Sequence, residues 1–568
     1  MSMRTLPETS AGFADATWES LSPWYQELQD APLSAATRDE WLARWSRLDA
    51  LVMEAASLAL IAYTCDTNDS AKEAAHRRFS MEIIPQLEES EVGLAKRLVE
   101  VGIDRADMQP VLKRFRSAIE IFREANVPLV AEAEGLATQY QQVTGTMTAP
   151  WEGEQVPLPR LTPFLKSQDR SVREAAWRAS TAPYVAARDE MATIFSRMVE
   201  LRNQMAANAG FDNYVDYIFA AKCRFDYTPA DVLQLQQSIA TVVGPAIERA
   251  LESRRERLGL DTVRPWDLMV DPWRREASVP FRDAEELQEV AARIFEKIDP
   301  ALGGEFRTMI DEKLLDLESR PGKAPGGYCD TLHARGRPFI FMNAAGVPED
   351  VNTLMHEAGH SFHAFSSHAQ PFIWQRHPSS EAAELASMSM ELLSAPHFAK
   401  PVGYYEEPAA ISARLEHLED VLITLAHIAS IDAFQTWIYT HAEGGDADAR
   451  DAAWLEIRAR FEPGVDWSGL QDERVARWYR QLHVFLYPFY YIEYAIAQIG
   501  ALQVWRNARK DAAEAVAAYR RFLALGATRP LPELYEAAGV RFAFDAGLLK
   551  ELVDLVEEEM GVLRGKLL

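Results

Sequence analysis

The chain has 568 residues, and its 59 lysines and arginines are outnumbered by 85 aspartates and glutamates, which gives a formal net charge of −26 at pH 7. Such an acidic chain is a poor partner for phosphate backbones and anionic membranes, so neither nucleic acids nor membranes are expected as partners. The three cysteines are scattered, and the first residues lack the apolar core of a signal peptide; these features exclude a disulfide framework and predict a cytoplasmic location.

Long amphipathic segments and abundant Ala, Leu, Glu and Arg predict a mainly α-helical protein. The clearest break is the proline-rich stretch from Thr148 to Arg160, after which a new helical segment opens near Asp169. We therefore expect a helical N-terminal domain over residues 1–155 and a second, larger domain over residues 156–568.

A strand, a tight turn and a helix are predicted in succession within the second domain. Residues 337–343 form an apolar run typical of a short strand, and small residues follow as the connection: Ala344, Ala345 and Gly346. Pro348 and Asp350 suit the first turn of a helix, whose apolar stripe recurs at helical spacing: Val351, Leu354, Met355, Ala358, Phe362 and Phe365. We expect the free edge of the strand to bind an extended peptide through its backbone, with the three turn residues beside it.

The same helix carries His356-Glu357-Ala358-Gly359-His360, a His-Glu-x-x-His pattern. Positions i and i+4 project from one helix face, so His356 and His360 can bind a single Zn²⁺, and Glu357 can act as general base toward a metal-activated water. A chance match would more often lie on an exposed helix, whereas this helix has a buried stripe. Strand, small-residue turn and such a helix are the arrangement that zincins use, and we predict one zinc ion per chain.

The third zinc ligand must come from elsewhere, because a catalytic zinc usually takes three protein ligands and leaves one position open. The third histidine of a metzincin would fall at Ser366, which excludes that class. His363 lies one turn beyond His360, but three ligands from one straight helix crowd one side of the metal, so we expect His363 to support the ligands or to be structural.

A second predicted helix, residues 379–393, supplies better candidates for the third ligand. Glu381, Glu384 and Glu391 lie on one face of this otherwise small and apolar helix, where a buried carboxylate needs a partner such as a metal or a metal-bound histidine.

A group of aromatic residues near the C-terminus is a candidate for stabilising negative charge during catalysis. His483, Tyr487, Tyr491 and Tyr494 are spaced so that one helical face can present all four, with Pro488 as a possible interruption. Such stripes are more often core than catalytic, but phenol and imidazole donors beside a zinc site can stabilise an oxyanion.

These segments resemble peptidase family M3. The run from His356 to His363 is similar to the family signature, which has a glycine before the second histidine and a further histidine three residues on. The run from Glu384 to Glu391 matches a Glu-x-x-Ser-x-x-x-Glu segment, so the resemblance implies that Glu384 is the third ligand and that Glu391 supports a ligand. Gly359 would then let the second helix approach closely enough for Glu384 to reach the zinc.

Residues 488–503 resemble the oligoendopeptidase F branch of this family. The resemblance implies that Tyr491 and Tyr494 face the substrate, with Tyr490 competing with Tyr491, and that His483 belongs to the same cluster. The chain departs from relatives such as thimet oligopeptidase, which have a glycine-rich loop where this chain has residues 485–488. The glycine-rich stretch 321–329 is similar to a segment that precedes the active-site strand in the family, or else is a surface loop.

The resemblance implies a large helical bowl or two-lobed zincin with a deep substrate groove and a small β-sheet near the active-site helix. Its implied activity is zinc-dependent cleavage of internal bonds in short oligopeptides. Two alternatives are a related zinc exopeptidase, such as a carboxypeptidase or dipeptidase, and a catalytically silent peptide-binding protein. The sequence makes no prediction about the oligomeric state.

Overall fold

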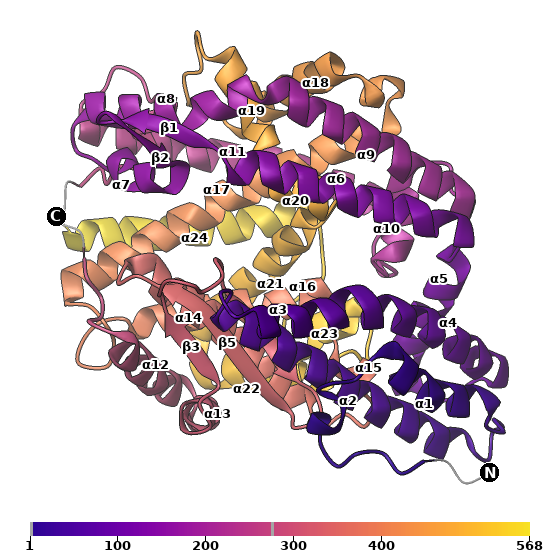
Figure 1. Ribbon diagram of the computed structural model, residues 1–568. Helices are drawn as coiled ribbons and strands as arrows, with labels where there is room; N and C mark the ends of the chain where they lie inside the picture. The colour runs from indigo at the N-terminus through magenta and orange to yellow at the C-terminus, as the bar shows by residue number, and fades with distance from the viewer. Residues whose placement is uncertain (1–3, 274–277, 568) are drawn as a thin grey trace.

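The structure is a computed structural model that describes residues 4–273 and 278–567. It is mainly α-helical, with only small sheets in the described part of the chain, which confirms the predicted fold class. In Figure 1 the N-terminal helices lie at the lower right, and the chain then crosses the top of the molecule before it forms the sheet at the lower left.

The N-terminal helices have an apolar core of their own. Trp45 is at its centre, fully buried, and its ring packs against those of Trp41, Phe115 and Trp374. The helices of this part are α1 (Trp18–Asp30), α2 (Arg38–Cys65), α3 (Ser70–Arg77), α4 (Ile84–Val101) and α5 (Gln109–Ile121).

The next segment begins with α6 (Val127–Gly145), which packs in the main core rather than in the N-terminal one. Its Tyr140 is buried, stacks on Phe485 with ring centroids 3.9 Å apart, and donates a hydrogen bond to the Tyr479 carbonyl. The predicted proline-rich break contains an antiparallel hairpin of β1 (Thr148–Trp151) and β2 (Glu154–Pro157). The boundary near residue 155 stays a prediction.

After the hairpin the elements that the structure describes up to Asp311 are helices, with a long connection between α11 and α12. The elements are α7 (Thr162–Leu165), α8 (Arg170–Ala186), α9 (Arg188–Ala209), α10 (Tyr214–Ala221), α11 (Pro229–Leu258), α12 (Ala284–Ile298) and α13 (Pro300–Asp311).

A three-stranded sheet with the order β3-β5-β4 follows, formed by β3 (Leu315–Glu318), β4 (Tyr328–Leu332) and β5 (Arg337–Ala344). The strand predicted at 337–343 is β5, but the expectation that it has a free edge is wrong, because β3 pairs with it in parallel and β4 pairs with it in antiparallel fashion. Its unbroken apolar run is typical of a central strand that is buried on both faces. An edge of this sheet belongs instead to β4, which begins inside the glycine-rich stretch 321–329.

The sheet packs against α14 (Pro348–Ser367), which carries the His-Glu-x-x-His segment. The helix α16 (Ser380–Ser394) packs between α14 and α21 (Tyr491–Lys510), and α22 (Ala512–Leu525) packs against α14 as well. The remaining helices are α15 (Ile373–Arg376), α17 (Glu407–Thr440), α18 (Ala447–Phe461), α19 (Gln471–Tyr479), α20 (Leu482–Leu486), α23 (Leu531–Ala537) and α24 (Ala546–Leu567).

Two helices, α2 and α17, are long and apolar enough to cross a membrane by length and composition alone. Within their apolar windows 56% and 67% of the residues are buried inside the fold. Such burial is typical of core helices, and α17 packs against α11, α21 and α24 in the main core.

Candidate metal centre and active site

The start of α14 is determined locally. The Asp350 carboxylate accepts hydrogen bonds from the N–H groups of Ala345, Gly346 and Val347, and Pro348 occupies the first turn. The structure therefore uses the N–H groups of Ala345 and Gly346 to begin the helix, so they are not free for a substrate. The carbonyl of Ala344 accepts a hydrogen bond from the Ser319 N–H.

Three side chains from two helices converge beyond this point. His356 and His360 project from one face of α14, and Glu384 reaches them from α16. The Glu384 Oε2 atom lies 3.2 Å from His356 Nε2 and 3.6 Å from His360 Nε2, and one potential ligand atom from each residue lies within 4.8 Å of the others. Two imidazole nitrogens and one carboxylate oxygen are a donor set that suits zinc.

The close approach of α14 and α16 depends on Gly359. A Cβ atom at this position would lie 2.5 Å from the Ser387 Cα and 2.8 Å from the Ala386 carbonyl oxygen, closer than side-chain atoms are found. The Glu384 carboxylate is itself held by the Ser387 hydroxyl, which donates to it over 3.0 Å.

Glu357 lies on the same helix, directly after the first histidine, and is 8% exposed. Burial raises the pKa of its carboxyl to about 7, with His356 opposing the shift and Glu384 adding to it. The backbone N–H of Cys329 on β4 also interacts with this carboxyl. A carboxyl with a pKa near neutrality can both accept and return a proton, which is the requirement for a general base that later acts as an acid.

The other acids predicted on α16 have separate partners. Glu391 accepts a hydrogen bond from His356, with 2.7 Å between its Oε1 and the Nδ1 of the imidazole. Glu381 is also buried, but its carboxylate accepts a hydrogen bond from the Tyr227 hydroxyl. The structure thus brings Glu384 and Glu391, not Glu381, to the histidine pair.

His363 points into the core behind the metal-binding face. It is 4% exposed, its ring packs against Phe522, and neither ring nitrogen has a hydrogen-bond partner within the described residues. Burial lowers its pKa to about 3. A neutral imidazole in this position is part of the packing between α14 and α22, and the role of His363 stays a prediction.

The aromatic residues near the C-terminus do not share one helical face. Helix α20 ends at Leu486, α21 begins at Tyr491, and Pro488 lies between them, followed by Phe489 with a φ of 60°. A left-handed φ is unfavourable for Phe, and buried hydrogen bonds hold it: its N–H donates to Gln435, and its carbonyl accepts from Arg224. The single helical face that the spacing allows is therefore interrupted, and the interruption contains Pro488, as the sequence left open.

After this bend, Tyr490 and Tyr494 lie together. The Tyr494 hydroxyl donates to the Tyr490 hydroxyl over 3.1 Å. Burial and the nearby Glu384 carboxylate raise the pKa of both phenols, so both tyrosines are neutral donors close to the predicted ligand.

Tyr491 contacts other residues than Tyr490 and Tyr494 do. Its hydroxyl donates to Gln481 over 3.2 Å, and its ring packs edge-on against His427. His483 contacts both Tyr490 and Tyr491. Its ring stacks on that of Tyr490 with centroids 5.5 Å apart, and it packs edge-on against the ring of Tyr491 with centroids 5.0 Å apart.

Some residues around the site could not be identified from the sequence. Lys222 lies over the Tyr490 ring at 5.1 Å and forms an ion pair with Glu493, and Gln481 holds Tyr491. His417 on α17 contacts Glu391. None of them belongs to a recognisable motif, and only the packing of distant segments reveals their position.

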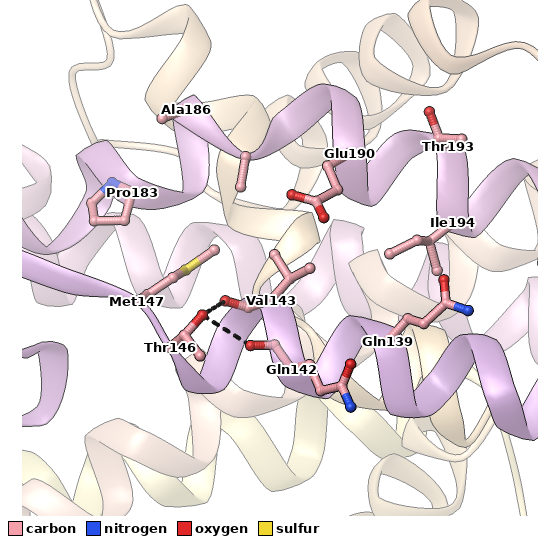
Figure 2. Close-up of a pocket in the computed structure, with 11 residues that line it drawn as sticks. Gln139, Gln142, Val143, Thr146, Met147, Pro183, Ala186, Glu190, Thr193 and Ile194 are labelled. Atoms are coloured by element: carbon pink, nitrogen blue, oxygen red, sulfur yellow. Dashed lines mark hydrogen bonds between the residues drawn. The ribbon is translucent and has the colours of Figure 1, made fainter.

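One surface pocket lies away from this centre. It has a volume of about 980 Å³ and opens between α6 and the junction of α8 and α9, with Gln142 and Val143 on one side and Pro183 and Glu190 on the other (Figure 2). Its lining contains none of the residues predicted for the metal centre or the aromatic group. The candidate active site is therefore the side-chain cluster on α14, α16 and α21, which this pocket does not include.

A His-Glu-x-x-His helix that packs between a small sheet and a glutamate-bearing helix, with three converging ligand side chains, is the arrangement of a metal-dependent peptidase. The chain belongs to peptidase family M3. The model of this family matches residues 164–554, and that of the Peptidase M3 N-terminal domain matches residues 13–106. The family resemblance seen in the sequence is thereby confirmed.

Two oligopeptidases illustrate the similarity in sequence. The oligoendopeptidase F homolog of Lactococcus lactis subsp. lactis (strain IL1403) is 22% identical over 410 residues, which cover 70% of this chain and 66% of that protein. Oligopeptidase PepF of Bacillus subtilis (strain 168) is 25% identical over 388 residues, covering 66% of this chain and 55% of that protein. These alignments thus span slightly less than two thirds of the first relative and just over half of the second.

Solved structures match nearly the whole chain. PZ peptidase A with inhibitor 2 has a TM-score of 0.85 at 27% identity, covering 98% of both chains. A putative oligoendopeptidase F has a TM-score of 0.86 at 28% identity, covering 96% of this chain and 97% of that one.

Proposed function

We propose that this protein is a zinc-dependent endopeptidase that hydrolyses internal bonds of short oligopeptides. The observation that carries this proposal is the convergence of His356, His360 and Glu384, with Glu357 next to them, in a chain of peptidase family M3. The oligoendopeptidase F names among the relatives favour cleavage of oligopeptides over that of folded proteins.

His356, His360 and Glu384 would hold one zinc ion per chain. The Glu384 side chain is 6% exposed, and a carboxylate so buried beside two imidazoles needs a cationic partner, which zinc provides. Bound zinc supplies a Lewis acid that activates water and polarises the peptide carbonyl.

The residues of the chain supply the proton transfers and the hydrogen bonds. Glu357 takes a proton from the attacking water and passes it to the leaving amine, for which a pKa of about 7 is suitable. Tyr490 and Tyr494, which face Glu384, donate hydrogen bonds to the oxyanion, and His483 orients Tyr490 through its stacked ring. Tyr491 is proposed to hold the substrate from the side of Gln481.

The substrates proposed here are short peptides, and the proposed location is the cytoplasm. The net charge of −26 disfavours nucleic acids and anionic membranes as partners. A zinc exopeptidase of related fold is the second candidate, because carboxypeptidases and dipeptidases share the same metal chemistry.

One experiment tests the proposal and separates these candidates. Purified protein should contain about one zinc per chain and should cleave an internally quenched peptide of about ten residues. Mass spectrometry of digests of free and end-blocked peptides should show internal cleavage of both. Glu357→Gln should keep the zinc and lose cleavage. Cleavage that requires a free peptide end would support the exopeptidase, and full activity of Glu357→Gln would contradict the general-base assignment.

A further inference from the structure

The Glu391 carboxylate contacts two imidazoles, one from each side. Its Oε1 lies 2.7 Å from His356 Nδ1, and its Oε2 lies 2.9 Å from the Nε2 of His417. His417 is on α17, a helix that contributes no predicted ligand, and it is 61 residues beyond His356 in the chain. One carboxylate thus links α14, α16 and α17.

This arrangement determines which nitrogen of His356 is available to a metal. A carboxylate accepts hydrogen bonds, so the Nδ1 of His356 carries the proton and donates it to Glu391. The Nε2 atom, which lies 3.2 Å from Glu384, is then the nitrogen that can give its lone pair to a metal bound between the two side chains. A metal-binding imidazole needs this pairing of one protonated and one free nitrogen.

The second contact of Glu391 matters because the carboxylate is shielded from water. The side chains of Glu391 and His417 are 15% and 9% exposed. A buried carboxylate oxygen without a hydrogen-bond donor is unfavourable. Without His417, the Glu391 carboxylate would be free to rotate away from His356. His417 therefore restrains the orientation in which Glu391 meets His356.

We propose that His417 is a positioning residue of the metal centre, which fixes Glu391 and through it the tautomer and orientation of His356. The inference rests on the proposed zinc site at His356, His360 and Glu384. In this role His417 does not contact the substrate.

Zinc affinity of the full-length protein tests this role without relying on activity. Zinc is removed, and the dissociation constant is measured by competition with a chromophoric chelator for wild type, His417→Leu and His417→Gln. We expect His417→Leu to weaken zinc binding about tenfold, the lower end of the range seen when partners of metal ligands are lost. His417→Gln, whose side-chain amide can still donate to Glu391, should recover most of the affinity.

A matched control lies on the same helix. His427 is also a half-buried histidine of α17. Its Nδ1 lies 3.3 Å from a guanidinium nitrogen of Arg458 and does not contact Glu391. His427→Leu should therefore bind zinc as wild type does. The visible spectrum of the Co²⁺-substituted proteins provides a second measurement, because it reports ligand geometry: His417→Leu should change it, and His417→Gln and His427→Leu should not.

The outcomes separate this inference from the proposed function. Wild-type zinc affinity and an unchanged Co²⁺ spectrum in His417→Leu would overturn the role of His417 alone. Equal losses in His417→Leu, His417→Gln and His427→Leu would also overturn it, because they would indicate a general effect on α17. A wild-type protein that binds no zinc would overturn the proposed function, and this inference with it.

Discussion

Replacing Gly359 by Ala tests whether the contact between α14 and α16 builds the metal centre. The new methyl group would meet the Ser387 Cα at 2.5 Å and the Ala386 carbonyl oxygen at 2.8 Å. Carbon atoms pack favourably at about 3.5–4.0 Å, so the two helices must move apart locally by about 1 Å. Backbone atoms cannot rotate away as a flexible side chain can, and Glu384 moves with its helix.

The expected magnitude combines two opposing effects. Insertion of a methyl group into a well-packed core costs about 1–3 kcal/mol, whereas Ala is favoured over Gly in a helix by about 1 kcal/mol. Gly135→Ala isolates the second effect, because Gly135 is an exposed glycine of α6 with nothing within 4 Å of the new methyl group. The helix-propensity gain cancels between the two variants, so Gly359→Ala should be less stable than Gly135→Ala by about 1–3 kcal/mol.

Two measurements apply to both variants. Urea unfolding of the metal-free proteins gives the difference in the free energy of unfolding, and chelator competition gives the zinc dissociation constant. Displacement of Glu384 should weaken zinc binding in Gly359→Ala by about 10–100-fold, as for other disturbances of ligand geometry. Equal stability and equal zinc affinity of Gly359→Ala and Gly135→Ala would refute the reasoning.

Three further predictions concern the ligand, the oxyanion donors and a buried acid. Glu384→Ala should lose zinc in metal analysis while Glu381→Ala keeps it, and the reverse result would move the third ligand to Glu381. Tyr494→Phe should lower kcat by about 100-fold with zinc content unchanged, as for loss of one oxyanion donor, and an unchanged kcat would remove Tyr494 from the proposed mechanism. Burial raises the pKa of Asp432 to about 6, above the value of about 3.9 for an unfolded chain, so its ionised form destabilises the fold above pH 6, and this cost disappears as the pH falls toward 4. Asp432→Asn should therefore raise the free energy of unfolding by about 2 kcal/mol at pH 8 and by less at pH 5 in urea titrations, and an equal gain at both pH values would contradict this.

The local parts of the site could be predicted from the sequence because they depend on helical spacing. His356 and His360 are four residues apart on one helix, so they share a face wherever the helix lies. The apolar stripe of α14 and the capping role of Asp350 are likewise properties of neighbouring residues. The family signature added Glu384 and Gly359; the structure places Glu384 3.2 Å from His356 and Gly359 at the contact of α14 with α16, and their roles in zinc binding stay predictions.

The parts that could not be predicted depend on segments far apart in the chain. The apolar run of β5 predicts a strand but not its neighbours, and β3 and β4 pair with both of its edges. The spacing of the C-terminal tyrosines suggested one helical face, but the bend at Pro488 directs Tyr490 and Tyr494 toward Glu384 and Tyr491 toward Gln481.

The sequence by itself therefore determined the mainly helical fold, the family, the histidine pair and the adjacent Glu357, because hydrophobic periodicity and motif spacing are encoded within a few turns of helix. Only the tertiary structure decided which tyrosines lie beside Glu384 and that His417 holds Glu391. Helical spacing left Glu381 and Glu384 both open as ligands, and the family resemblance selected Glu384. The structure adds the reason that Glu381 is unsuitable, because Tyr227, which is 154 residues away, donates a hydrogen bond to it. Such choices are made by packing between distant helices, which no local pattern records.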